Sequence, residues 1–166
     1  FTLRARFGVL RDYGMTMSPL NAFQLIQGLE TLTIRIKQHS KNALKIAEFL
    51  EKHPKVKSVN YPGLKSSKFN KIIQEKYLDG MAGGLLCFEV EDFDTAKKVM
   101  DKTEIFSVVV NIGDTKSIIS HSASTTHSQL TKEELEKAGV GEGLLRLSIG
   151  LENADDLIAD LENALK

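Results

Sequence analysis

Residues 108–150 read VVVNIGDTKSIISHSASTTHSQLTKEELEKAGVGEGLLRLSIG and hold most of the unusual polar side chains of the chain. Near their end, apolar and polar residues alternate through Leu145-Arg146-Leu147-Ser148-Ile149, a pattern typical of a strand. A guanidinium at an inward-looking strand position is costly unless it meets an anion. Arg146 is therefore the first candidate for a binding residue.

Two kinds of anion can satisfy Arg146. One is a structural carboxylate such as Glu152 or Asp114, since a partly buried arginine commonly pairs with an acidic side chain. The other is the carboxylate of a bound substrate, which the planar guanidinium binds through two parallel hydrogen bonds. The pattern of residues leaves both partners open.

Around this stretch, short apolar runs alternate with amphipathic segments. Predicted strands cover 56–61, 84–91, 106–110, 117–120 and 144–149, and predicted helices cover 68–77, 93–102, 132–138 and 154–165. The predicted N-caps are Ser66 or Ser67, Thr131 in a capping box with Glu134, and Asn153. This order predicts an α+β fold with a small, mostly antiparallel sheet and helices on one face.

A long helical pattern precedes that layer. Ser18 is a predicted N-cap with Pro19 at the first helical position, and His53-Pro54 ends the pattern. A break near Gly28 would leave a short helix followed by a long one from about Glu30 to Lys52. The solvated face of the long helix is predicted to carry the basic residues Arg35, Lys37, His39, Lys41 and Lys45.

Composition narrows the class of protein. The chain has 166 residues, a usual size for one domain, and 22 basic side chains balance 22 acidic ones. That balance argues against a nucleic-acid or anionic-membrane surface, and no run of about 18 apolar residues predicts a membrane span. The single cysteine, Cys87, lies in an apolar run and is predicted to be a buried free thiol. A reducing, cytoplasmic location follows from it.

His121 and His127 flank a loop rich in serine and threonine. With only one thiol in the chain, a zinc site lacks ligands, so no metal is predicted. A histidine beside a hydroxyl could support nucleophilic catalysis, but no nucleophile elbow is present. Both histidines are therefore expected to have hydrogen-bonded structural roles.

Four segments resemble the Cys/Met-metabolism family of pyridoxal-phosphate enzymes. They are LRDYGMTMSPLNAFQLIQGLETL (10–32), HPKVKSVNYPGL (53–64), NIGDTKSIISHSASTTHSQL (111–130) and LLRLSIGLE (144–152). The resemblance implies the C-terminal part of a fold-type I, aspartate-aminotransferase-like subunit. Residues 1–30 would be the tail of the large cofactor domain, 31–53 a linking helix and 54–166 the C-terminal α+β domain.

The resemblance also assigns roles to residues. Arg146 matches the arginine that clamps the α-carboxylate of the amino acid substrate, Asn111 matches a loop position lining the same site, and Thr126 matches a position near its mouth. The lysine that binds pyridoxal 5'-phosphate, and the other cofactor-binding residues, lie upstream in the family and have no counterpart in this chain. No catalytic residue, cofactor ligand or metal ligand is thus expected here, and the chain alone is expected to be an inactive fragment.

Asn111, Asp114 and Lys116 favour the branch that acts on O-acetylhomoserine with sulfide or methanethiol, giving homocysteine or methionine plus acetate. The alternatives are a cystathionine γ-synthase or γ-lyase of the same family, or a non-enzymatic ligand-binding module. The implied partners are an amino acid substrate and further copies of the subunit in a dimer or tetramer, without nucleic acid or membrane.

Overall fold

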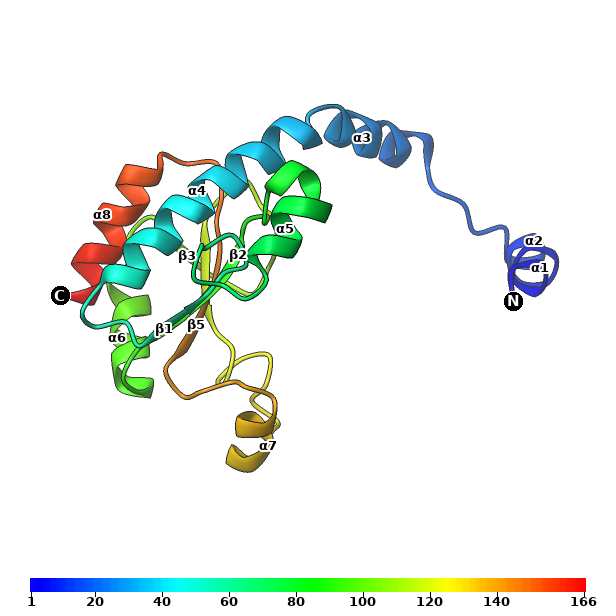
Figure 1. Cartoon of the computed structure of the whole chain (residues 1–166). Helices are drawn as coiled ribbons and strands as arrows, with labels where there is room; N and C mark the ends of the chain where they lie inside the picture. The colour runs from blue at the N-terminus through cyan, green and yellow to red at the C-terminus, as the bar shows by residue number, and fades with distance from the viewer. The chain divides into compact units, whose positions relative to one another are not determined.

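The structure is a computed structural model that describes the backbone of residues 1–166 and every side chain except those of residues 78, 132 and 136. It contains two compact units, Phe1–Ile34 and Arg35–Lys166, and Figure 1 follows the chain through both. The predicted division into 1–30, 31–53 and 54–166 stays a prediction. None of the helices described combines the length and hydropathy that crossing a bilayer requires.

The first unit is helical. It contains α1 (Thr2–Arg4), the π-helical η1 (Ala5–Leu10), α2 (Arg11–Tyr13) and α3 (Pro19–Glu30). The predicted cap of α3 is confirmed, because Ser18 Oγ accepts the Asn21 N–H at 3.2 Å and Pro19 occupies the first turn. The predicted division into a short helix and a long one is confirmed, with the break at Thr31, three residues after Gly28. A helix tolerates an interior glycine for about 1 kcal/mol, so Gly28 did not need to end it.

The second unit is built on a five-stranded sheet in the order β1-β2-β5-β4-β3. Its strands are β1 (Ser58–Asn60), β2 (Leu85–Glu89), β3 (Ser107–Val108), β4 (Ile118–His121) and β5 (Leu144–Ser148). Only the β3–β4 pair is parallel, so the predicted mostly antiparallel α+β layer is confirmed. β3 is shorter than expected because Val109 turns back, its N–H donating to Ser107 O at 3.1 Å.

Helices pack on one face of this sheet (Figure 1). They are α4 (Leu32–Lys52), α6 (Phe93–Lys102) and α8 (Ala154–Leu165), whereas α5 (Asn70–Lys76), η2 (Leu78–Gly80) and α7 (Lys132–Lys137) lie in the connections. The shared core holds Ile46 and Leu50 of α4, Val99 of α6, and Leu157 of α8. Leu86, Phe88, Leu145, Leu147 and Ile119 meet them from the sheet. Alternate strand residues therefore point away from the helices.

Local capping explains where these helices begin. Asn153 Oδ1 accepts the Asp155 N–H at 2.8 Å, and Glu134 Oε2 accepts the Thr131 N–H at 2.8 Å, as predicted. The predicted serine cap of α5 was wrong: Phe69 occupies the N-cap position and makes no side-chain cap. Ser67 Oγ instead accepts the N–H of Phe69 itself, at 3.3 Å, which closes a turn before the helix.

His39 corrects a further prediction. It was expected on the solvated face of the long helix, but its side chain is buried and its Nδ1 lies 2.6 Å from Ile149 O. Position 39 shares its helix face with Ala43 and Ile46, both in the core. The spacing of three to four residues therefore placed this polar side chain inward, where it finds a backbone partner.

Candidate carboxylate-binding site

Arg146 lies on the face of the sheet opposite the helices. Its strand neighbours Leu145 and Leu147 are fully buried in the core, whereas Arg146 is partly exposed. In register, Arg146 pairs with Cys87 of β2 on one side and Ser120 of β4 on the other. Asn60 of β1 pairs with Cys87 and extends the same cross-strand row. The guanidinium thus occupies the middle of a small polar row.

Neither structural carboxylate considered for Arg146 pairs with it. Glu152 accepts the Ser117 N–H at 2.7 Å and the Ser117 O–H at 2.8 Å. Asp114 accepts the Lys116 N–H at 3.1 Å, and this bond lowers the pKa of its exposed carboxyl. Among the described side chains, no carboxylate lies within ion-pair distance of Arg146. An anion other than these described side chains can therefore pair with the Arg146 guanidinium.

Cys87 was predicted to be buried, but its side chain is only partly buried and belongs to the polar row. Its neighbours Leu86 and Phe88 take the core side of β2, so strand alternation sends Cys87 to the other side. Burial raises the pKa of the Cys87 thiol, and the charge of Arg146 opposes that shift. The pKa thus reflects the proximity of the two side chains.

Asn111 lies in the loop between β3 and β4. Its side chain is exposed, and its Oδ1 accepts the Ile112 N–H at 2.9 Å. Gly113, two residues further on, has a φ of 79° and donates its N–H to Ser148 Oγ at 3.0 Å. Ser148 lies two residues beyond Arg146 on β5 and so faces the same side. The structure therefore ties the Asn111 loop to the strand and face that carry Arg146.

Thr126 lies in the loop after β4. The loop is folded on itself, because the His127 N–H donates to Ser122 O at 2.9 Å and Thr126 Oγ1 lies 2.9 Å from His127 Nδ1. β4 ends at His121, which pairs with Leu145 at the beginning of β5. The Thr126 loop thus leaves the sheet near one end of β5, whereas Gly113 is attached near the other. No described hydrogen bond joins Thr126 to Arg146.

His121 has a structural role, as expected. Its side chain is buried, its Nε2 lies 2.7 Å from Glu142 O, and its Nδ1 lies 2.9 Å from Ser124 Oγ. The ring also packs edge-on against Phe93 at 5.2 Å. Both ring nitrogens are occupied, so the histidine stabilises the β4 end.

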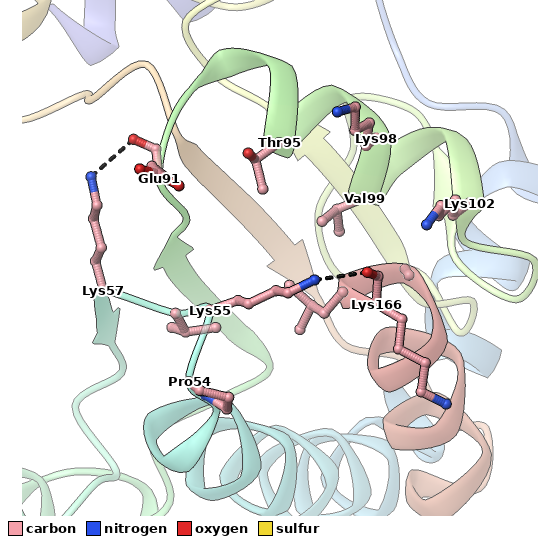
Figure 2. Close-up of a pocket in the computed structure, with 12 residues that line it drawn as sticks. Pro54, Lys55, Lys57, Glu91, Thr95, Lys98, Val99, Lys102 and Lys166 are labelled. Atoms are coloured by element: carbon pink, nitrogen blue, oxygen red, sulfur yellow. Dashed lines mark hydrogen bonds between the residues drawn. The ribbon is translucent and has the colours of Figure 1, made fainter.

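A separate cavity of about 630 Å³ lies among the segment that precedes β1, α6 and the end of α8. Figure 2 shows its lysines and its two marked hydrogen bonds, from Lys55 to Lys166 O at 2.7 Å and from Lys57 to Glu91 O at 2.9 Å. None of the three predicted site residues lines it. It is therefore distinct from the Arg146 face, and its lysines offer control positions for that site.

The strand residues on the Arg146 face combine one guanidinium with several uncharged polar side chains. All the strand residues on this face are Ser58, Asn60, Leu85, Cys87, Glu89, Ser107, Ile118, Ser120, Leu144, Arg146 and Ser148. The described residues contain no cluster of His, Cys, Asp or Glu able to hold a metal ion. What the face does offer is a guanidinium, a group whose planar fork suits a carboxylate. Sequence alone did not reveal Ser120 and Cys87 as its neighbours, because the strand pairing is non-local.

Known proteins match the chain over nearly all of its length. The family model for Cys/Met metabolism PLP-dependent enzymes matches residues 2–166. O-acetyl-L-homoserine sulfhydrylase of Leptospira meyeri is 53% identical over 168 residues, covering 100% of this chain and 38% of that protein. L-methionine gamma-lyase of Fusobacterium nucleatum subsp. polymorphum is 44% identical over 163 residues, covering 97% of this chain and 41% of that protein.

A solved structure agrees with these relatives. A Campylobacter jejuni protein, whose crystal structure contains N'-pyridoxyl-lysine-5'-monophosphate, matches with a TM-score of 0.90 and 51% identity over 98% of this chain and 39% of that one. The chain thus spans about two fifths of the length of the relatives that it matches. The predicted fold type, family and cofactor are confirmed: the chain belongs to the Cys/Met-metabolism family of enzymes that depend on pyridoxal phosphate.

Proposed function

We propose that this chain forms the substrate-carboxylate side of an enzyme that converts O-acetylhomoserine and sulfide (or methanethiol) to homocysteine (or methionine) and acetate. The observation that carries the proposal is Arg146, a guanidinium on the open face of the sheet with no carboxylate partner among the described residues. The 53% identity to the Leptospira meyeri sulfhydrylase supports the choice of reaction.

In the proposed reaction, the C–O bond at the γ carbon breaks, acetate leaves, and a C–S bond forms in its place. Pyridoxal phosphate, when bound, supplies an electron sink for the pair released when the α C–H bond breaks. Arg146 contributes orientation, because two parallel hydrogen bonds to the α-carboxylate fix that end of the substrate. The γ carbon, at the other end of the substrate, is then free to exchange acetate for sulfur.

Asn111 is proposed to assist Arg146. Its Oδ1 is occupied by the Ile112 N–H, which leaves the side-chain nitrogen available to donate to the same carboxylate. Thr126 is proposed to lie near the mouth of the site, where its hydroxyl is already paired with His127. Its contribution to binding is therefore expected to be smaller than that of Arg146.

The test is Arg146→Ala in the full-length gene product that contains this chain. The KM for O-acetylhomoserine should rise strongly, reflecting a loss of about 2–4 kcal/mol from a charge-assisted pair. The visible absorbance of the bound cofactor should persist, because no residue on the Arg146 face is assigned to it. Lys102→Ala, at the separate cavity, is the matched loss of a cation and should leave the KM unchanged. An unaltered KM in the Arg146→Ala enzyme would refute the proposal.

The second candidate is γ-elimination, which the 44% identity to L-methionine gamma-lyase favours. The two reactions share the carboxylate clamp but differ in whether an external sulfur nucleophile is required. Incubating the full-length enzyme with L-methionine alone distinguishes them, since only elimination releases methanethiol. Supplying cysteine instead of sulfide tests the cystathionine γ-synthase alternative, and no turnover with any of these substrates would favour a binding module.

The proposal includes a cytoplasmic homo-oligomer, a dimer or tetramer. The free thiol of Cys87 is compatible with a reducing compartment. Light scattering of the full-length protein measures the oligomeric state, and a monomer would contradict the proposed homo-oligomer.

A further inference from the structure

The β3–β4 loop that carries Asn111 is exposed along most of its length. Residues 109–116 are all exposed, whereas Ser117 and the β4 residues that follow it are buried. An exposed loop has few contacts of its own, so its position relative to Arg146 depends on the bonds that anchor it. Two of those bonds end on one carboxylate.

Glu152 is that carboxylate. Its Oε1 accepts the Ser117 N–H at 2.7 Å, and its Oε2 accepts the Ser117 O–H at 2.8 Å. Ser117 Oγ in turn accepts the Gly150 N–H at 2.8 Å. Three short bonds thus join the end of the loop to the turn that follows β5, and we name Ser117, Gly150 and Glu152 the polar clamp.

Two further bonds bring the rest of the loop to the same strand and turn. The Leu151 N–H donates to Thr115 O at 2.8 Å, and the Gly113 N–H donates to Ser148 Oγ at 3.0 Å. Gly150 allows this approach, because a Cβ at that position would overlap Thr115 O and Glu152 Oε2. The loop is therefore held against β5 on both sides of Lys116, within a few residues of Arg146.

The turn itself is fixed from the helix side. Asn42 donates its side-chain N–H groups to Gly150 O at 3.0 Å and to Glu152 O at 2.9 Å, and His39 Nδ1 lies 2.6 Å from Ile149 O. The Asn111 loop is consequently joined through the polar clamp to the turn after β5, and through that turn to α4. Groups that must meet one substrate carboxylate need this kind of support.

We infer that Glu152 is a positioning residue for the carboxylate site: through Ser117 it holds the Asn111 loop in register with Arg146. Glu152 itself does not touch the substrate in this inference. The inference rests on the proposed function, in which Arg146 and Asn111 bind the same carboxylate.

The test variant is Glu152→Gln in the full-length enzyme. One amide oxygen can still accept the Ser117 N–H, but the charge-assisted bond from the Ser117 O–H to a carboxylate is lost and can be replaced only by a neutral bond from the amide nitrogen to Ser117 Oγ, so the polar clamp is weakened without a change of size. The KM for O-acetylhomoserine should rise roughly tenfold while kcat changes less, as expected when a binding group is displaced. Ser117→Ala removes the bond from the Ser117 O–H to Glu152 together with the one that Ser117 Oγ accepts from the Gly150 N–H, should raise the KM at least as much, and serves if Glu152→Gln does not fold.

A double-mutant cycle with Asn111→Ala separates positioning from general destabilisation. If Glu152 acts through the Asn111 loop, Glu152→Gln should raise the KM much less in the Asn111→Ala background than in the wild-type enzyme. Asp160→Asn is the matched control. Its buried carboxylate accepts the Glu104 N–H and the Ile105 N–H, both at 2.9 Å, so the variant loses a comparable anchor elsewhere and should keep the KM.

The outcomes distinguish this inference from the proposed function. If Arg146→Ala leaves the KM unchanged, the proposed function fails. If Arg146→Ala raises the KM but Glu152→Gln and Ser117→Ala do not, the function stands and the positioning role of Glu152 is overturned. The positioning role is also overturned if the two effects in the cycle simply multiply.

Discussion

The side-chain nitrogen of Asn42 lies 2.9 Å from the backbone oxygen of Glu152, across a sequence separation of 110 residues. The same nitrogen lies 3.0 Å from Gly150 O, so one amide satisfies two carbonyl groups in the turn after β5. Asn42 thereby joins α4 to the turn that follows the strand carrying Arg146.

Asn42→Ala should destabilise the unit of residues 35–166. Both carbonyl groups lose their donor, and each unsatisfied buried group costs about 1–3 kcal/mol. Urea unfolding should show a lower midpoint with a similar slope. Lys41→Ala, on the exposed face of the same helix, should shift the free energy of unfolding by less than about 0.5 kcal/mol. Equal effects from the two variants would contradict the anchoring role of Asn42.

Gly150→Ala and Gly113→Ala should differ in severity. An alanine Cβ at position 150 would overlap Thr115 O, a backbone atom that cannot move aside cheaply, whereas nothing lies within 4 Å of a Cβ at position 113. The cost at Gly113 is limited to the left-handed φ of 79°, about 1–2 kcal/mol. Thermal unfolding of the two variants measures which one loses more stability. A smaller loss at Gly150 than at Gly113 would contradict the close packing of this turn.

Sequence reasoning succeeded where the determining contacts are local. The caps at Ser18, Thr131 and Asn153 each form within three residues, so a short motif contains all the required groups. The α+β order was accessible for the same reason, because the period of apolar residues reports which type of element is present. Local patterns therefore predicted most of the fold.

The parts that sequence did not reveal depend on distant partners. Cys87 lies in an apolar run that is equally compatible with burial on both faces, and only the pairing of β2 with β5 places it beside Arg146. The hydrogen-bond partner of the buried His39, Ile149 O, is 110 residues away. The polar clamp is also invisible in sequence, since Ser117 and Glu152 are 35 residues apart.

Cys87 should report the charge of Arg146 through its reactivity with iodoacetamide. The thiolate is the reacting species, so burial, which raises the thiol pKa, should make this cysteine slower than a free one at neutral pH. Arg146→Gln removes the opposing charge, so the thiol pKa should rise further. The midpoint of the pH–rate profile should then move to higher pH, whereas Lys102→Gln should not move it. An unchanged profile in Arg146→Gln would contradict the pairing of the two side chains.

Stability should fall at alkaline pH because two acidic groups have raised pKa values in the folded state. Burial raises the pKa of both Tyr61 and Cys87, so the folded protein holds these protons at pH values where the unfolded chain releases them. The stabilisation is fully present below the ordinary thiol pKa of about 8.5, and is lost as pH rises towards the folded-state values. Tyr61→Phe should flatten the part of this decline above about pH 10. The free energy of unfolding as a function of pH provides the measurement, and a curve for Tyr61→Phe as steep as wild type would contradict this prediction.

Comparing Asn111→Asp with Asn111→Ala tests the carboxylate site more sharply than Asn111→Ala alone. Asn111→Asp can keep the oxygen that accepts the Ile112 N–H, but it replaces the donor nitrogen with a second anionic oxygen. If that nitrogen donates to the substrate carboxylate, two like charges would then face each other, so the KM should rise more in Asn111→Asp than in Asn111→Ala. Asp114→Asn, in the same exposed loop, keeps an oxygen that can accept the Lys116 N–H and should leave the KM unchanged. Steady-state kinetics of the full-length enzyme give the ranking. A KM for Asn111→Asp at or below that of Asn111→Ala would mean that Asn111 does not meet the carboxylate, and Arg146 would then bind it without this residue.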